Sequence, residues 1–110
     1  MKAPDKRIIE LRLARENLEK RIHELASAGE VAFSEHAYDR MDERGISDIQ
    51  VERALRTGHI SGEIVPGSRP GEWKCKVVER MKGMRDIGVV TIVIHNARLF
   101  IKTVEWEDMK

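Results

Sequence analysis

Two residues of one short segment, His36 and Arg40, have the types and the spacing for acid–base chemistry on a phosphodiester. They are four positions apart, so their side chains are neighbours if the segment is a helix. Cleavage of RNA without a metal needs a base for the 2′-OH proton, an acid for the leaving oxygen and a cation for the charge on the phosphoryl oxygens. Histidine can take either proton-transfer role near neutral pH, and arginine is a permanently charged, forked phosphate ligand. The pair therefore fits metal-independent RNA cleavage.

On a helix of about 3.6 residues per turn, His36 and Arg40 fall at the border between an apolar and an acidic face. The apolar face carries Phe33, Ala37 and Met41, and the acidic face carries Glu35, Asp39, Asp42 and Glu43. A side chain at such a border can be fixed by packing and still reach solvent, and Arg44 extends the row by one turn. Because acids are near, the pattern is also typical of a surface ion-pair cluster, and both interpretations stay open from spacing alone.

A second group of cations alternates along a predicted strand from Trp73 to Met81. One face of this strand carries Trp73, Cys75 and Val77, and the other carries Lys74, Lys76, Val78 and Arg80. Residues 66–86 contain six Lys and Arg against three acids, whereas residues 30–57 contain four Arg against seven acids. A basic sheet region beside an acidic helical region is therefore expected, and the cations could follow an RNA backbone. A charge-balanced surface without a ligand is the alternative.

No residue pattern predicts a metal or a cofactor. The four histidines, His23, His36, His59 and His95, lack a second histidine at ligand spacing. The single cysteine, Cys75, cannot form an internal disulfide and is expected to be a small core residue.

The composition is that of one globular domain, because 41% of the 110 residues are apolar and 35% are charged. Charges interrupt the N-terminus from Lys2 to Arg12, so no apolar signal core is present there. The longest apolar run, Val89 to Ile94, is far shorter than a membrane span. A cytoplasmic protein without membrane contact is the expectation.

Residues 5 to about 27 are expected to form one long helix, capped by Asp5 and stopped near Gly29. Its apolar stripe is narrow and resembles that of a coiled coil, with apolar residues spaced alternately three and four positions apart. The stripe consists of Ile8, Leu11, Leu18, Ile22 and Leu25, and Arg15 occupies the one position without an apolar residue. Such a stripe packs equally well on its own sheet or on a second copy. A monomer and a homodimer through the first helix therefore both stay open.

Two shorter helices are expected next. The first runs near Ser34 to Arg44 and ends at Gly45. The second begins with a capping box of Ser47 and Gln50 and ends at Gly58.

After this helix pair the pattern becomes extended, in the segments Ile60 to Val65, Trp73 to Met81, Ile87 to Ile94 and Leu99 to Trp106. The predicted fold is α+β, with a long N-terminal helix and a helix pair packed on one face of a curved, roughly four-stranded antiparallel sheet. Residues 1–29 are expected as an N-terminal helical extension and residues 30–110 as the α+β domain, in one compact unit.

From His36 to Ile46 the chain contains the pattern His-Ala-x-x-Arg-Met-x-x-Arg-Gly-Ile. The pattern resembles the signature of a bacterial family of unknown function, similar to RelE-like toxins of the barnase–EndoU–colicin–RelE ribonuclease fold. The resemblance covers about residues 31–107. It implies helices followed by a four-stranded antiparallel sheet, with His36 and Arg40 in the active site and Thr103 as a third member. It also implies an antitoxin partner, in some cases a zinc-binding one.

One function and two alternatives follow. The expected function is a toxin-like, metal-independent endoribonuclease, with Arg44, Lys74, Lys76 and Arg80 as RNA-binding residues. The first alternative is a non-catalytic protein-binding module that dimerises through the first helix. The second is a helix-turn-helix DNA-binding regulator, against which stand Asp48 and Glu52 at the base-reading end of the second short helix.

Overall fold

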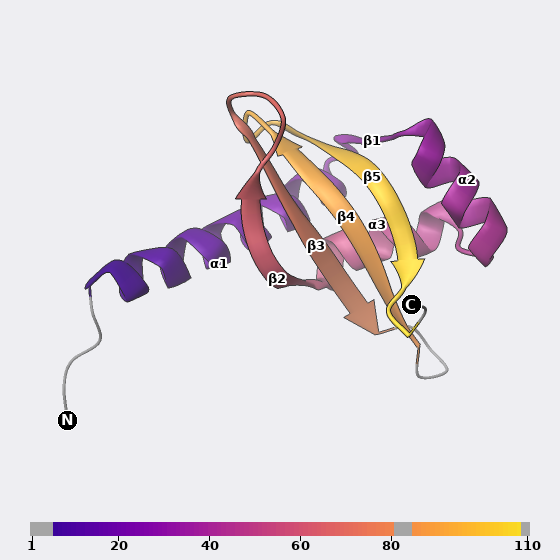
Figure 1. Cartoon of the computed structure of the whole chain (residues 1–110), viewed down its shortest axis with the longest axis horizontal. Helices are drawn as coiled ribbons and strands as arrows, with labels where there is room; N and C mark the ends of the chain where they lie inside the picture. Colours follow the sequence, from indigo (N-terminus) through magenta and orange to yellow (C-terminus); the bar gives the residue numbers. More distant parts are fainter. Residues whose placement is uncertain (1–5, 81–84, 109–110) are drawn as a thin grey trace.

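A computed structural model of the chain describes residues 6–80 and 85–108, with side chains from residue 12 onward. Within these ranges the molecule has three helices and one five-stranded sheet, an α+β fold as expected (Figure 1). The elements are α1 (Lys6–Ser27), β1 (Val31–Phe33), α2 (Glu35–Arg44), α3 (Asp48–Thr57), β2 (His59–Pro66), β3 (Glu72–Arg80), β4 (Asp86–Ile94) and β5 (Arg98–Trp106). The expected cap Asp5 and the expected strand end Met81 lie outside the described residues.

The sheet has the strand order β1-β5-β4-β3-β2, so the apolar strand β4 is central. All neighbours are antiparallel except β1, which runs parallel to β5. The expectation of about four antiparallel strands was therefore one strand short. The additional strand has three residues, Val31–Phe33, a length at which alternation gives no signal, and it forms only by pairing with Leu99–Ile101 far along the chain.

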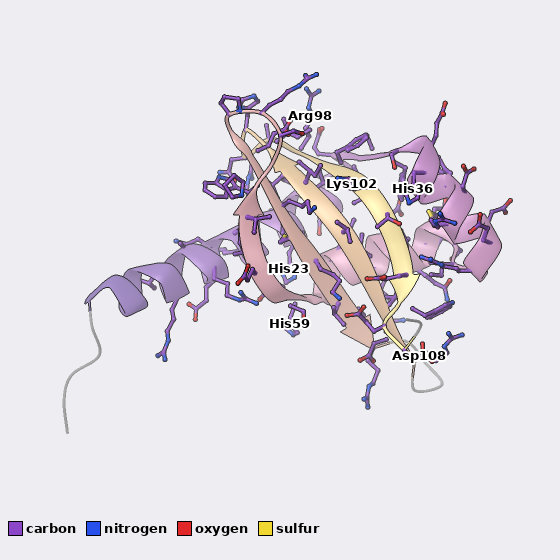
Figure 2. All side chains as sticks on the ribbon, viewed as in Figure 1. His23, His36, His59, Arg98, Lys102 and Asp108 are labelled. Carbon is purple, nitrogen blue, oxygen red and sulfur yellow. The ribbon has the colours of Figure 1, made fainter. Side chains whose placement is uncertain are left out.

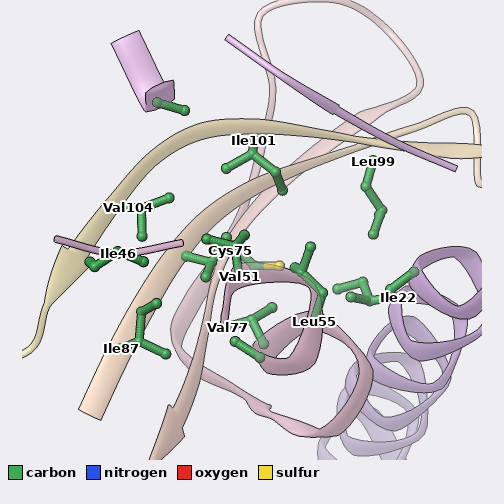
Figure 3. Packing of buried hydrophobic residues seen from close by; sticks show 14 of the residues in the cluster. Ile22, Ile46, Val51, Leu55, Cys75, Val77, Ile87, Leu99, Ile101 and Val104 are labelled. Atoms are coloured by element: carbon green, nitrogen blue, oxygen red, sulfur yellow. The ribbon is translucent and has the colours of Figure 1, made fainter. Parts of the chain in front are cut away.

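One face of the sheet is covered by α1 and α3, which lie behind it in Figure 1. The core fills this layer (Figure 3) and includes Ile22, Val51, Leu55, Val77, Val89, Leu99 and Ile101. Cys75 is 3% exposed within the core, as expected, and burial raises the pKa of its thiol to about 11. At neutral pH it is a packed thiol and not a nucleophile.

Local sequence signals fix the helix ends as expected. Ser34 is the N-cap of α2 and accepts a hydrogen bond from the Ala37 amide, and Gly45 ends the helix with a φ of 66°. Ser47 and Gln50 form the capping box of α3, and its buried side packs on β3 and β4. The helix pair is thereby held in one orientation against the sheet.

Side chains of α1 form hydrogen bonds with three outward-facing backbone groups of the edge strand β2. The Arg15 guanidinium donates to the carbonyl oxygens of Gly62 and Ile60, at 2.8 and 2.7 Å. Glu19 accepts the Ile60 amide at 2.7 Å and lies 3.3 Å from the His59 ring. Burial of the Glu19 carboxylate raises its pKa, but the hydrogen bonds from Ile60 and His59 outweigh this effect and leave its pKa below the ordinary 4.5.

Glu19→Gln is expected to lower the free energy of unfolding at neutral pH by about 1 kcal/mol, because glutamine keeps the acceptor for Ile60 but loses the charge. Because the pKa of Glu19 is lower in the folded state, its ionised carboxylate stabilises the fold at a pH above its ordinary pKa. This stabilisation is lost as the pH falls through the pKa of the folded state. The difference between parent and variant in urea unfolding should therefore shrink below pH 4.5. Glu63→Gln, at an exposed position of β2, is the control and should have no effect at either pH. A difference that stays constant into acid would contradict this role of Glu19.

The opposite sheet edge, on β5, is covered by α2 beyond the end of β1. The Ser34 hydroxyl donates to the Lys102 carbonyl at 2.9 Å, and the Arg44 guanidinium donates to the Val104 carbonyl at 2.6 Å. In return the Trp106 indole donates to the Arg44 carbonyl at 2.9 Å. The expected helix pair is thus divided, since α3 lies on the sheet face while α2 lies along the sheet edge. None of the described helices is long and apolar enough to cross a membrane.

Candidate active site

The face of the sheet opposite the helices α1 and α3 carries the candidate site, and a bulge in β5 determines which residues it presents. Val90 pairs with Thr103, whereas the next residue of β4 pairs with Ile101, so Lys102 has no partner in the ladder. The extra residue reverses the alternation of β5. Ile101 and Val104 therefore both point into the core, and Thr103 points to the open face.

The register places two of the expected cations on this open face with Thr103. Lys76 of β3, Val90 of β4 and Thr103 of β5 form one row across the sheet. At about 4.8 Å between strands, Lys76 and Thr103 are on the order of 10 Å apart. Lys74 lies in the adjacent row, together with the ring of Phe100. Three consecutive strands thus bring two of the expected cations and Thr103 to one face of the sheet.

The orientation of α2 about its own axis determines whether His36 and Arg40 lie toward the helical side or toward the open face of the sheet. The Tyr38 and Phe33 rings are in contact, with centroids 5.2 Å apart, and Phe33 packs against the core. Tyr38 therefore marks the side of α2 that is turned to the helical layer. His36 is about 200° from Tyr38 around the helix, and Arg40 follows His36 one turn later. Both lie at the opposite border of α2, which is turned to the open face of the sheet.

The start of α2 is tied to the bulge of β5. Ser34 bonds the Lys102 carbonyl, and His36 follows Ser34 by two residues. Figure 2 shows His36 beside β5, near Lys102. The His36 side chain is exposed, and among the described residues it has no hydrogen-bond partner. An exposed imidazole next to a sheet face can reach a bound ligand.

Two of the cations nearest the site have carboxylate partners. Arg40 pairs with Glu43 one turn along α2. Lys76 lies 2.9 Å from Glu107 and 3.7 Å from Glu105, and the hydrogen bond that Lys76 donates to Glu107 raises the pKa of Lys76. A phosphate would have to compete with these carboxylates, so neither cation is a permanently open ligand.

The remaining expected cations differ in their surroundings. Arg80 is at the far end of β3, 3.4 Å from Asp86, and Arg44 bonds the β5 backbone. Within the described chain, Lys74 makes no salt bridge, and it is half-buried on the open face. Lys102, an exposed residue that the sequence analysis missed, lies at the bulge. No sequence signal marks Lys102, because a bulge depends on how two strands pair.

The acids of α2 are turned to solvent. Glu35, Asp39, Asp42 and Glu43 are all exposed, on the side of α2 away from Ala37 and Met41, which are buried. Glu35, Asp39 and Asp42 therefore face away from the open face of the sheet, whereas Glu43 pairs with Arg40 at the border that is turned to this face. The described residues contain no group of three or more His, Cys, Asp or Glu that could hold a metal ion.

Comparison with protein families gives a match to the family described as "Domain of unknown function (DUF4258)", over residues 33–106. The matched segment includes α2, α3 and strands β2 to β5, and it leaves out α1. Comparisons with curated proteins and with solved structures gave no match.

Proposed function

The chain belongs to the DUF4258 family, and we propose that it is a metal-independent endoribonuclease of the toxin type. One observation carries the proposal. The border of α2 with His36 and Arg40 is turned to the open sheet face, on which Thr103, Lys76 and Lys74 lie. An imidazole, a guanidinium and a hydroxyl beside lysines are the groups that RNA cleavage without a metal requires.

In this mechanism the 2′-oxygen of RNA attacks the adjacent phosphorus, and the bond from phosphorus to the 5′-oxygen breaks. His36 makes one of the two proton transfers, as the base that takes the 2′-OH proton or as the acid that protonates the leaving 5′-oxygen, and water makes the other. Arg40 exchanges Glu43 for the phosphate and stabilises the charge on the non-bridging oxygens. The Thr103 hydroxyl donates a hydrogen bond to one of these oxygens. The products are a 2′,3′-cyclic phosphate and a free 5′-OH.

The surrounding cations hold the RNA backbone. Lys74 and Lys102 are the leading contacts, because neither makes a salt bridge within the described chain. Lys76 and Arg80 contribute once phosphate displaces their carboxylate partners. Arg44 has a different role, since its guanidinium orients α2 on β5. We place the protein in the cytoplasm, as a RelE-like toxin with an antitoxin protein as its partner.

The test is cleavage of RNA by the purified full chain in EDTA, on free RNA and on ribosome-bound mRNA. We expect cleavage that EDTA does not reduce, with a cyclic phosphate on the upstream product. An oligonucleotide of the same sequence with 2′-deoxyribose at the cleaved position is the control and should stay intact, because it lacks the attacking oxygen. Absence of cleavage on both RNA substrates, or equal cleavage of the 2′-deoxy control, would overturn the proposal.

A further inference from the structure

An apolar strip runs along the centre of the open sheet face. Val90, Ile92 and Ile94 of β4 point to this face, and all three are half-buried. In Figure 1 the open face is turned to the viewer, and α1 and α3 lie behind the sheet. The solvent face of an antiparallel sheet commonly carries polar side chains, and an apolar patch with a polar rim is typical of an interaction site. The strip therefore indicates that this face binds a partner.

Phe100 of β5 adds an aromatic ring to the strip. It is in register with Ile92 on one side and with Ala32 of β1 on the other. The ring is half-buried, and within the described chain it pairs with no other aromatic ring. Ala32 is exposed, and its single methyl group is too short to cover the neighbouring ring. Phe100 therefore presents part of its ring to solvent.

The ring of Phe100 lies one row away from the proposed reacting groups. Thr103 pairs with Val90, which is two residues along β4 from Ile92, the partner of Phe100. Two residues of a strand rise about 7 Å, so the rows of Phe100 and Thr103 are separated by roughly this distance. His36 lies near Lys102, which is between Phe100 and Thr103 in β5 (Figure 2). A nucleotide next to a phosphate at Thr103 and His36 is thus within reach of the ring.

The cations around Phe100 are complementary to a polyanion. Arg98 and Lys102 are exposed, two residues before and after Phe100, and Lys74 lies in the row of Phe100, about 10 Å away across two strands. Within the described chain none of the three makes a salt bridge. Glu72, in the row of Arg98, is the one acid in these two rows. Unpaired cations beside an exposed ring favour single-stranded nucleic acid, because its phosphates bind the cations and its bases stack on the ring.

We propose that Phe100 stacks on the base of a nucleotide next to the cleaved bond, while Arg98 and Lys102 bind the phosphates on either side. The position of this bond rests on the proposed ribonuclease function. A base in a double helix is paired and stacked, whereas a base of a single strand can be splayed out onto an aromatic side chain. Phe100 therefore restricts the substrate to RNA that is unpaired beside the cleaved bond. It takes no part in proton transfer.

The test is the dissociation constant of a single-stranded RNA oligonucleotide for the full chain, measured by fluorescence anisotropy. Each 2′-OH of the oligonucleotide is replaced by 2′-O-methyl, so that the strand lacks the attacking oxygen and binding is measured without cleavage. Phe100→Leu should weaken binding by at least about fivefold, because leucine keeps an apolar side chain but has no ring. Phe100→Tyr keeps the ring and should bind like the parent. Ile94→Ala is the matched control for the loss of apolar surface on the same face, and it should also bind like the parent.

An abasic strand of the same length separates stacking from charge, because it keeps the phosphates and lacks the bases. The parent should bind the abasic strand more weakly than the strand with bases, and Phe100→Leu should not weaken binding of the abasic strand further. A comparison of the two strands on the parent needs no variant, and circular dichroism checks that the variants fold.

Equal binding of the strand with bases by the parent and by Phe100→Leu would overturn the inference. So would an equal loss on the abasic strand, or a parent that binds neither strand, which would leave the open face to a protein partner. Binding as expected, without cleavage of the unmodified RNA, would overturn the proposed ribonuclease function and leave the stacking site in place. The two proposals therefore fail on different measurements.

Discussion

His36→Ala is expected to abolish RNA cleavage and to leave the fold intact. General acid–base catalysis contributes about 10²–10⁴-fold to a rate, so the cleavage rate should fall by roughly that factor. The fold should survive, because the His36 side chain is exposed and the cap of α2 depends on Ser34. Single-turnover cleavage rates, with thermal unfolding of the same samples, measure both effects.

The comparison needs variants of the same helix. Arg40→Ala should lose cleavage to a similar degree, because it removes the cation for the phosphoryl charge. Asp39→Ala is the control, because Asp39 is exposed on the acidic side of α2 and should cleave like the parent. If His36→Ala and Arg40→Ala both cleave like the parent, the site is elsewhere in the molecule. If Asp39→Ala is equally impaired, the loss reflects the helix and not the two residues.

Leu55→Ala is expected to lower the free energy of unfolding by about 2–5 kcal/mol, the largest stability effect of a single change proposed for this chain. Leu55 is 0% exposed, in the layer between α1 and the sheet. The loss combines the transfer of the removed methyl groups with the cavity that they leave. Urea unfolding at neutral pH measures it, and a total stability of about 5–15 kcal/mol leaves the variant folded but marginal.

Ile49→Ala is the control for this prediction, because Ile49 is on the same helix and is 71% exposed. It should change the free energy of unfolding by no more than about 0.5 kcal/mol. Equal effects at both positions would mean that α3 is not packed as described.

Features with local causes could be predicted from the sequence. The start of α3 follows from the Ser47 and Gln50 pair, and the end of α2 follows from Gly45, because a cap needs only residues within one turn. The alternation of β3 also placed Cys75 in the core and Lys74 on the open face. These predictions were confirmed.

Features that depend on distant partners could not be predicted. Strand β1 exists only by pairing with β5, and Arg15 and Arg44 bond backbone groups 45 and 60 residues away. Alternation alone would have put Thr103 on the core side with Ile101, and only the bulge turns it outward. For the candidate site, helix periodicity therefore located His36 and Arg40 at a border of α2. Helix periodicity could not show which part of the sheet this border of α2 faces.

Because α1 bonds the edge of β2, the folded unit includes a helix that lies outside the segment matched by the family. The family match begins at residue 33, after α1 has ended. A chain cut at that point would lose Arg15 and Glu19 and would leave the Ile60 and Gly62 backbone groups open along β2. Open strand edges recruit other strands, and aggregation is the usual result. A relative that consists of the matched segment alone would have to prevent pairing at that edge in another way, through its own charges or through a protein that it binds.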